Sequence, residues 1–151
     1  MCRIKWFVAK RLAERRTGGR KTKMILVIED DETTRELTAR ILRLAGHTVV
    51  TAIDGREALT ILEQNRPSLI FTDLKMPGMD GWTFCRIQGS PAWATIPFVI
   101  VSAVMNLEHE GHVLGATGTI SKPADIGDIL QYATDYDSLN PLGDSCRTNS
   151  M

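Results

Sequence analysis

The sequence has few cysteines and no long hydrophobic segment. Its three cysteines, Cys2, Cys85 and Cys146, lie far apart and form neither a CxxC pair nor a metal-ligand cluster with histidine. The longest apolar runs, such as 24–28 and 97–101, have about five residues, whereas a helix that spans a bilayer needs about 20. The sequence therefore offers no disulfide framework and no membrane span, and we expect free thiols in a reducing cytoplasm.

Several common functional motifs are also missing. Neither GxGxxG nor GxxxxGK[ST] occurs, so the chain has no sign of a dinucleotide site or a P-loop. The basic start of the chain lacks the apolar segment and the small-residue cleavage site of a secretory signal. With 151 residues there is room for one ordinary domain plus tails, which excludes a receptor with separate sensor and output domains.

The formal net charge is zero, but charge is unevenly distributed along the chain. Residues 1–23 contain nine Lys or Arg and one Glu, whereas the remainder contains nine basic and seventeen acidic residues. We therefore treat 1–23 as a basic leader. A rough apolar stripe of Ile4, Phe7, Val8 and Leu12 leaves three alternatives open: an amphipathic helix on a membrane, a nucleic-acid-binding arm, or a flexible or mis-started extension.

After the leader, short apolar runs alternate with segments of helical periodicity. This alternation predicts strands joined by helical crossovers, and hence a parallel sheet covered on both faces. Gly46, Asp54 and Pro67 mark expected helix boundaries. We predict an α/β domain over residues 24–136 and a disordered tail over 137–151. The predicted strands are 24–28, 48–52, 69–72, 98–101 and, weakly, 119–120.

Chemically active side chains follow four of these strands directly. Glu29 and Asp30 follow the first, Asp73 the third, Ser102 the fourth and Lys122 the fifth. Ligands of parallel sheets bind beyond the carboxyl ends of the strands, so we expect these side chains to converge. Clustered carboxylates repel one another unless a cation lies between them, and Mg²⁺ favours one or two carboxylates with a carbonyl and phosphate oxygens.

This set of residues fits phosphoryl transfer. Asp73 could attack a phosphoryl group and form an aspartyl phosphate, while Lys122 and Ser102 neutralise and hydrogen-bond its other oxygens. Ordinary structural roles remain open for single residues, since Asp31 and Glu32 favour a helix N-terminus and Asp73 could cap a turn. The placement of Asp30, Asp73, Ser102 and Lys122 after four different strands favours the functional interpretation over separate structural roles.

Residues 24 to about 136 resemble a stand-alone, chemotaxis-type receiver domain of the response regulators of two-component signalling. The segments that carry the resemblance are ILVIEDDETTR, AIDGREAL, LIFTDLKMPGMDG, PFVIVSA and TISKP. The resemblance implies a flavodoxin-like, doubly wound, five-stranded parallel sheet in the order 2-1-3-4-5 with about five helices. We expect a short fourth helix, because Gly111, Gly115 and Gly118 fall between Ser102 and Lys122.

The resemblance also implies a metal site. Glu29 and Asp30 would form the acidic pair of the family, and Asp30, Asp73 and the backbone carbonyl of Lys75 would ligate Mg²⁺. In receivers, the residues that correspond to Lys75 and Val104 flank the water that attacks the phosphoryl group. Neither side chain offers a carboxylate or an amide, so we expect slow self-dephosphorylation.

The remaining roles concern the phosphoryl group and the switch. By resemblance Asp73 is the phosphoacceptor, Ser102 the switch hydroxyl and Lys122 the phosphate-binding lysine, followed by the cis-peptide-forming Pro123. Thr119 stands where the family usually has Tyr or Phe. We therefore expect a switch that does not use an aromatic ring at this position.

Together these features predict a cytoplasmic signalling protein rather than an enzyme, phosphorylated by a sensor histidine kinase or a histidine phosphotransfer protein and read by a downstream protein. One alternative is a Mg²⁺-dependent phosphohydrolase with an Asp nucleophile. Hydrolases of the haloacid-dehalogenase type, however, require an acidic residue two positions after the nucleophile, where this chain has Lys75. Another is a nucleic-acid-bound regulator that uses the leader, but no helix-turn-helix segment follows residue 136. We expect neither nucleic acid nor membrane binding except through the leader.

Overall fold

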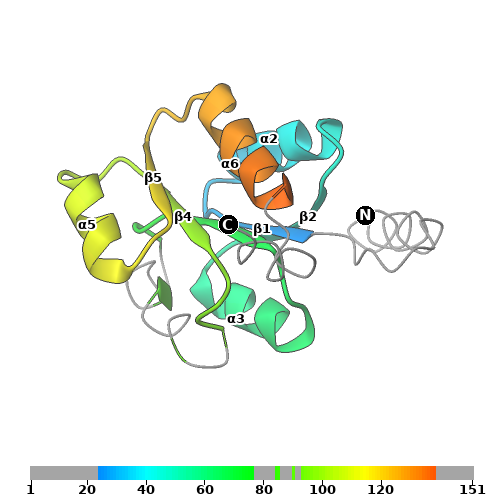
Figure 1. The fold of residues 1–151 in the computed structure, drawn as a ribbon, viewed down its shortest axis with the longest axis horizontal. Coiled ribbons are helices and arrows are strands. Elements are labelled where there is room, and N and C mark those ends of the chain that lie inside the picture. The colour runs from blue at the N-terminus through cyan, green and yellow to red at the C-terminus, as the bar shows by residue number, and fades with distance from the viewer. Residues whose placement is uncertain (1–23, 77–83, 86–89, 91–92, 139–151) are drawn as a thin grey trace, which may run out of the picture.

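The computed structural model describes residues 24–76, 84–85, 90 and 93–138, which form a sheet between two layers of helices (Figure 1). All neighbouring strands are parallel, and their order is β2-β1-β3-β4-β5. This order confirms the expected doubly wound topology. The strands are β1 (Met24–Ile28), β2 (Thr48–Ala52), β3 (Leu69–Thr72), β4 (Phe98–Ser102) and β5 (Gly118–Ser121).

Four helices lie within the described residues, compared with the five or so expected. They are α2 (Glu32–Leu44), α3 (Gly55–Gln64), α5 (Leu107–Leu114) and α6 (Ile126–Ser138). The short helix expected between the fourth and fifth strands is α5, which has eight residues. Most of the chain between β3 and β4 lies outside the described residues, as do the basic leader 1–23 and all but the first two residues of the predicted tail.

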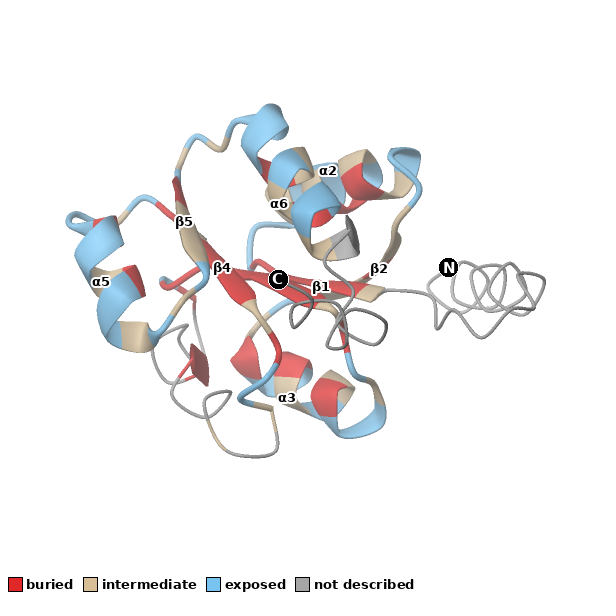
Figure 2. Ribbon diagram, in the orientation of Figure 1, coloured by how far each residue is buried: buried red, intermediate tan, exposed pale blue. Residues whose placement is uncertain are grey.

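The sheet is buried on both faces, as expected for parallel strands (Figure 2). Ile25 and Val27 of β1 pack with α2 and α6, whereas Leu26 and Ile28 pack with α3 and α5. Consecutive residues of a strand point to opposite faces, so one short apolar strand supplies both cores.

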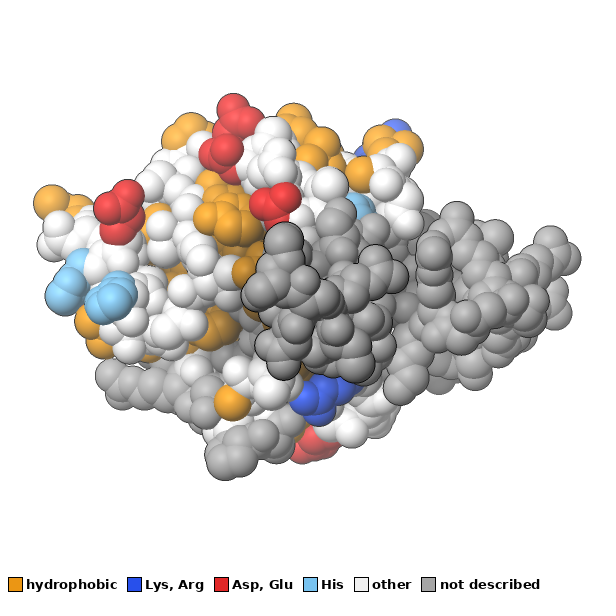
Figure 3. Space-filling view, viewed as in Figure 1, with side chains coloured by type: hydrophobic (Ala, Val, Ile, Leu, Met, Phe, Trp, Pro, Cys, Tyr) orange, Lys and Arg blue, Asp and Glu red, His pale blue; other side chains and the backbone are white. Residues whose placement is uncertain are grey.

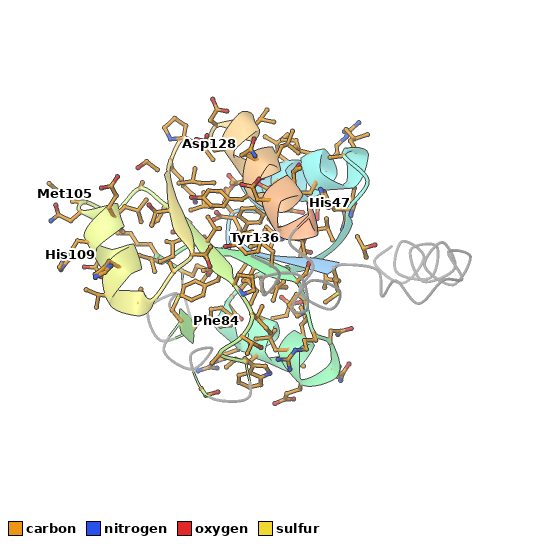
Figure 4. All side chains as sticks on the ribbon, in the orientation of Figure 1. His47, Phe84, Met105, His109, Asp128 and Tyr136 are labelled. Atoms are coloured by element: carbon orange, nitrogen blue, oxygen red, sulfur yellow. The ribbon has the colours of Figure 1, made fainter. Side chains whose placement is uncertain are left out.

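Side chains outside the strands also divide between these two cores. Phe84 is fully buried in the core beneath α3 and α5. Tyr136 of α6 packs against the other core, and Figure 4 shows the two rings on opposite sides of the sheet.

Local capping sets the helix boundaries that the sequence predicts. The side chain of Asp31 accepts a hydrogen bond from the Thr34 amide at 2.7 Å at the start of α2, and Asp54 accepts one from the Glu57 amide at 2.9 Å at the start of α3. Such caps satisfy helix amides that lack an intrahelical partner. Gly46, with a φ of 97°, follows the end of α2.

The apolar stripe of α2 predicts a helix but not the face that is buried. Leu37, Ile41 and Leu44 recur at helical spacing, yet the buried residues are Ala39 and Leu42. Leu37 and Leu44 are 55% and 80% exposed. Leu37 and Ile41 instead line a cavity of about 280 Å³ between α2 and α6. The neighbouring helix, which the sequence pattern of α2 does not specify, determines this orientation.

Two glycines permit close packing around β5. A Cβ atom at Gly111 of α5 would collide with the Thr119 side chain, and one at Gly118 would collide with the Tyr132 ring of α6. The sequence predicts that these glycines weaken the fourth helix, but they also let α5 and α6 approach the strand. The outward surface of α5 carries histidine side chains (Figure 3).

Candidate functional site

The polar residues that follow the strands lie together at one edge of the sheet. In the register of the parallel strands, Ile28 of β1 lies beside Thr72 of β3, and Ser102 of β4 lies beside Ser121 of β5. The residues that follow these strand ends therefore emerge at the same level. The structure brings Glu29, Asp73 and Lys122 into direct contact there.

Lys122 links two buried carboxylates. Its Nζ lies 2.6 Å from Oε2 of Glu29 and 2.6 Å from Oδ2 of Asp73. Glu29 and Asp73 are buried, and the lysine side chain is 24% exposed. A shared ammonium offsets the repulsion between two carboxylates that water screens poorly.

Backbone amides hold the other oxygen of Asp73. Its Oδ1 accepts hydrogen bonds from the Leu74 amide at 2.6 Å and from the Lys75 amide at 3.2 Å. The Asp73 amide itself donates to the Ile28 carbonyl at 3.3 Å. The carboxylate is therefore fixed from both sides, which suits a group that must meet a reactant in one orientation.

Three carboxylates at this edge could hold a metal ion. One ligand oxygen from each of Glu29, Asp30 and Asp73 lies within 4.8 Å of the others. Asp30 is exposed, which gives water access to the cluster. Three negative charges beside the single charge of Lys122 favour a hard divalent cation such as Mg²⁺, so the residues fit the expected metal. A role for the Lys75 carbonyl as a ligand stays a prediction.

The ionisation of two groups reflects this arrangement. Burial raises the pKa of the Glu29 carboxyl above its usual range, although the hydrogen bond from Lys122 acts in the opposite direction. Burial alone would lower the pKa of Lys122, but hydrogen bonds to Asp73 and Glu29 outweigh it, and the pKa is raised. Lys122 is therefore a stable cation at neutral pH.

Ser102 contributes a buried hydroxyl at the end of β4. The residue is 1% exposed, and within the described part of the chain its Oγ is the buried side-chain atom left without a hydrogen-bond partner. A buried hydroxyl of this kind costs free energy unless it gains a partner. β4 lies next to β3, whose end carries Asp73. The role of this hydroxyl as the switch residue stays a prediction.

The remaining predicted residues surround this centre. The Lys122–Pro123 peptide bond is cis. Val104 is half-buried and packs against the core beneath α3 and α5. Thr119 packs against Gly111 rather than leaving an open space beside α5. Their proposed effects on the switch stay predictions.

Sequence patterns did not predict one contact of the acidic loop. Arg35 of α2 donates from Nη1 to the backbone carbonyls of Glu29 at 3.0 Å and of Asp30 at 3.3 Å. An arginine on a helix five residues after Asp30 could have pointed to this contact, because its side chain can reach back to the loop before the helix.

A family model described as the response regulator receiver domain matches residues 25–134. The chain belongs to this family. Protein PilG of Pseudomonas aeruginosa is 31% identical over 120 residues, which cover 78% of this chain and 87% of PilG. The chemotaxis response regulator CheY4 of Vibrio cholerae has a similar structure, with a TM-score of 0.69 and 29% identity over 76% of this chain and 98% of CheY4.

Other members of the receiver family are longer proteins. The DNA-binding dual master transcriptional regulator RpaA of Synechocystis is 33% identical over 109 residues, which cover 70% of this chain but 45% of RpaA. The match to this signalling family does not favour the phosphohydrolase or nucleic-acid alternatives. Among the helices of the described segments, none is long and apolar enough to cross a membrane.

Proposed function

We propose that this chain accepts a phosphoryl group on Asp73 and signals by binding a partner protein in its phosphorylated form. The observation that carries the proposal is the setting of Asp73, a buried carboxylate with Oδ2 at Lys122 and Oδ1 on two backbone amides. The acidic residues Glu29 and Asp30 stand beside it. Membership of the receiver family supports the same function.

The phosphodonor is the phosphohistidine of a sensor kinase or of a phosphotransfer protein. An oxygen of Asp73 attacks phosphorus, the bond from phosphorus to the donor imidazole breaks, and the imidazole takes up a proton. Glu29, Asp30, Asp73 and the Lys75 carbonyl would hold Mg²⁺, which supplies positive charge to the transferring phosphoryl group. The protein's own part is to orient the nucleophile and to neutralise charge.

Lys122 and Ser102 stabilise the product. The ammonium of Lys122, already beside Asp73, pairs with a phosphoryl oxygen, and the Ser102 hydroxyl donates a hydrogen bond to another. Movement of Ser102 toward the phosphoryl group changes the end of β4 and the segment that follows it. This movement, with Thr119 and Val104 nearby, is the start of the signal.

We further propose that 24–136 is the receiver domain, with a separate leader, 1–23, and a tail, 137–151. The protein acts in the cytoplasm without enzymatic turnover beyond its own phosphorylation and dephosphorylation. Cys85 is buried and takes part in no disulfide among the described residues, which is compatible with a reducing compartment. The downstream partner is a protein that recognises the surface altered by phosphorylation.

Acetyl phosphate and Mg²⁺ provide a direct test. We expect intact-mass measurement to show one added phosphoryl group per wild-type chain and none on Asp73→Asn. Asp135→Asn, a matched change at an exposed position of α6, should leave uptake unchanged. Undiminished uptake by Asp73→Asn would contradict the assignment, and continuous release of phosphate from many monoesters would favour a hydrolase.

A further inference from the structure

Arg35 holds the loop that carries the acidic pair. Its side chain is half-buried on α2, and one guanidinium nitrogen, Nη1, donates to the carbonyl oxygens of both Glu29 and Asp30, at 3.0 and 3.3 Å. The guanidinium is a cation, so these hydrogen bonds are charge-assisted. A single side chain therefore fixes two consecutive peptide units.

These peptide units determine where the two acidic side chains point. The rest of the loop is held by the Asp31 amide, which donates to Oε1 of Glu29 at 3.3 Å, and by Asp31 as the cap of α2. Fixing both carbonyls limits rotation of the backbone on either side of Asp30. The orientation of an exposed carboxylate such as Asp30 depends on this restriction, because solvent does not hold it in place.

The two cations near the site bind different parts of the acidic pair. Lys122 bonds the carboxylates of Glu29 and Asp73, whereas the contacts of Arg35 with the loop are made to backbone oxygens. Arg35 can thus order the loop without using the carboxylate oxygens that a metal ion would need. Its positive charge, taken alone, would repel that ion.

We propose that Arg35 is a positioning residue for the divalent cation, and that it increases affinity for Mg²⁺ by holding Asp30 in the orientation of a ligand. The proposal rests on the proposed function, since it requires the cation to bind at Glu29, Asp30 and Asp73. A positioning role and a purely electrostatic role predict opposite results. Loss of the side chain weakens Mg²⁺ binding in the first case and strengthens it in the second.

Calorimetric titration of the full chain with Mg²⁺ tests the proposal. Arg35→Met should weaken binding roughly tenfold, the usual effect of removing a group that orients a metal ligand. Arg35→Lys keeps a cationic donor and should recover part of the affinity. Arg40→Met removes the same charge from an exposed position on the same helix and should leave affinity unchanged or slightly higher.

Phosphorylation kinetics give a second measurement. In Arg35→Met the Mg²⁺ concentration for half-maximal uptake from acetyl phosphate should rise roughly tenfold, as in the titration, while the rate at saturating Mg²⁺ stays near that of the wild type. A general loss of structure would lower the saturated rate instead. If Arg35→Met does not fold, as judged by thermal unfolding, then Arg35→Lys decides the matter, and unchanged affinity in that variant overturns the proposal.

Asp30→Asn separates this proposal from the function on which it rests. If Asp30→Asn binds Mg²⁺ as the wild type does, the metal site itself is wrong. If Asp30→Asn weakens binding but Arg35→Met retains or exceeds wild-type affinity, the site stands and the positioning role of Arg35 is refuted.

Discussion

At the scale of single residues, the buried carboxylate of Glu29 makes the stability of the fold depend on pH. Burial raises its pKa although Lys122 lies 2.6 Å away. An acid with a raised folded-state pKa binds its proton more tightly in the folded protein. Stability is therefore lost as pH rises from the unfolded pKa through the folded one, and the loss is complete once the pH exceeds the folded-state pKa.

This linkage predicts that Glu29→Gln stabilises the metal-free protein at pH 7. The advantage should shrink as pH falls below the raised pKa of Glu29, because the wild-type carboxyl then becomes neutral as well. Urea unfolding in EDTA across this pH range is the measurement. Glu63→Gln, at an exposed position of α3, is the control. A Glu29→Gln protein that is less stable than the wild type at pH 7 would show that the ion pair outweighs burial.

The contact between Gly118 and Tyr132 gives a second prediction at this scale. Gly118→Ala places a methyl group into the Tyr132 ring, so we expect a loss of about 1–3 kcal/mol in unfolding free energy. Tyr132→Leu removes the phenol and should make the double variant more stable than the two single changes predict. Additive losses in this double-mutant cycle would mean that the ring moves aside freely.

We predict that the lifetime of the phosphorylated form depends on Lys75, whose exposed side chain offers no acceptor to orient water. We expect slow self-dephosphorylation of the wild type. Lys75→Asn should speed it several-fold by adding an amide, whereas Lys75→Met should not. Decay of the phosphorylated chain, followed by intact mass after removal of the phosphodonor, measures both. A fast wild-type rate would refute this view of position 75.

At the scale of elements, α5 is a short helix that buries few side chains. Its buried residues are Leu107 and Gly111, and the side chain of its N-cap residue, Asn106, makes no capping hydrogen bond. Met105 before it is 87% exposed, and Figure 4 shows Met105 and His109 pointing away from the sheet. A helix with so little buried apolar surface opens locally at low free-energy cost.

We therefore predict that residues 104–118 form the element that changes on activation. Beryllofluoride, a phosphoryl mimic, should draw Ser102 toward Asp73 and increase protection from hydrogen exchange in this segment. Asp73→Asn with the same reagent is the control and should show no change. If protection is unchanged in this segment while another surface responds, the switch lies elsewhere.

The helices and strands also show which features of the fold can be predicted from the sequence alone. Four strands could be predicted because each is a local apolar run bounded by turn or cap residues, whereas the fifth, Gly118–Ser121, has one apolar side chain and could be predicted only weakly. The polar residues after the strands follow from the parallel topology. The buried face of α2 and the contact between Tyr132 and Gly118 could not be predicted. These depend on which helix lies beside which strand, and neither residue spacing nor propensity contains that information.

At the scale of the whole molecule, the carboxylates at the carboxyl-terminal edge of the sheet repel one another, and a bound divalent cation would reduce this repulsion. Glu29, Asp30 and Asp73 hold three carboxylates within reach of one ion, and Lys122 is the cation bonded to two of them. An ion that binds the folded chain and not the unfolded one stabilises folding by about 2.7 kcal/mol at a concentration 100 times its Kd.

For a domain of this size, that free energy raises Tm by roughly 10 °C. We predict a rise of this order for the wild type as Mg²⁺ approaches saturation, followed by calorimetry or circular dichroism. NaCl at matched ionic strength should have a much smaller effect, because screening does not replace coordination. Asp30→Asn should reduce the Mg²⁺ effect, since one ligand charge is lost. An equal rise with NaCl, or an undiminished one in Asp30→Asn, would mean that Mg²⁺ acts on the surface charge of the whole domain rather than at this edge.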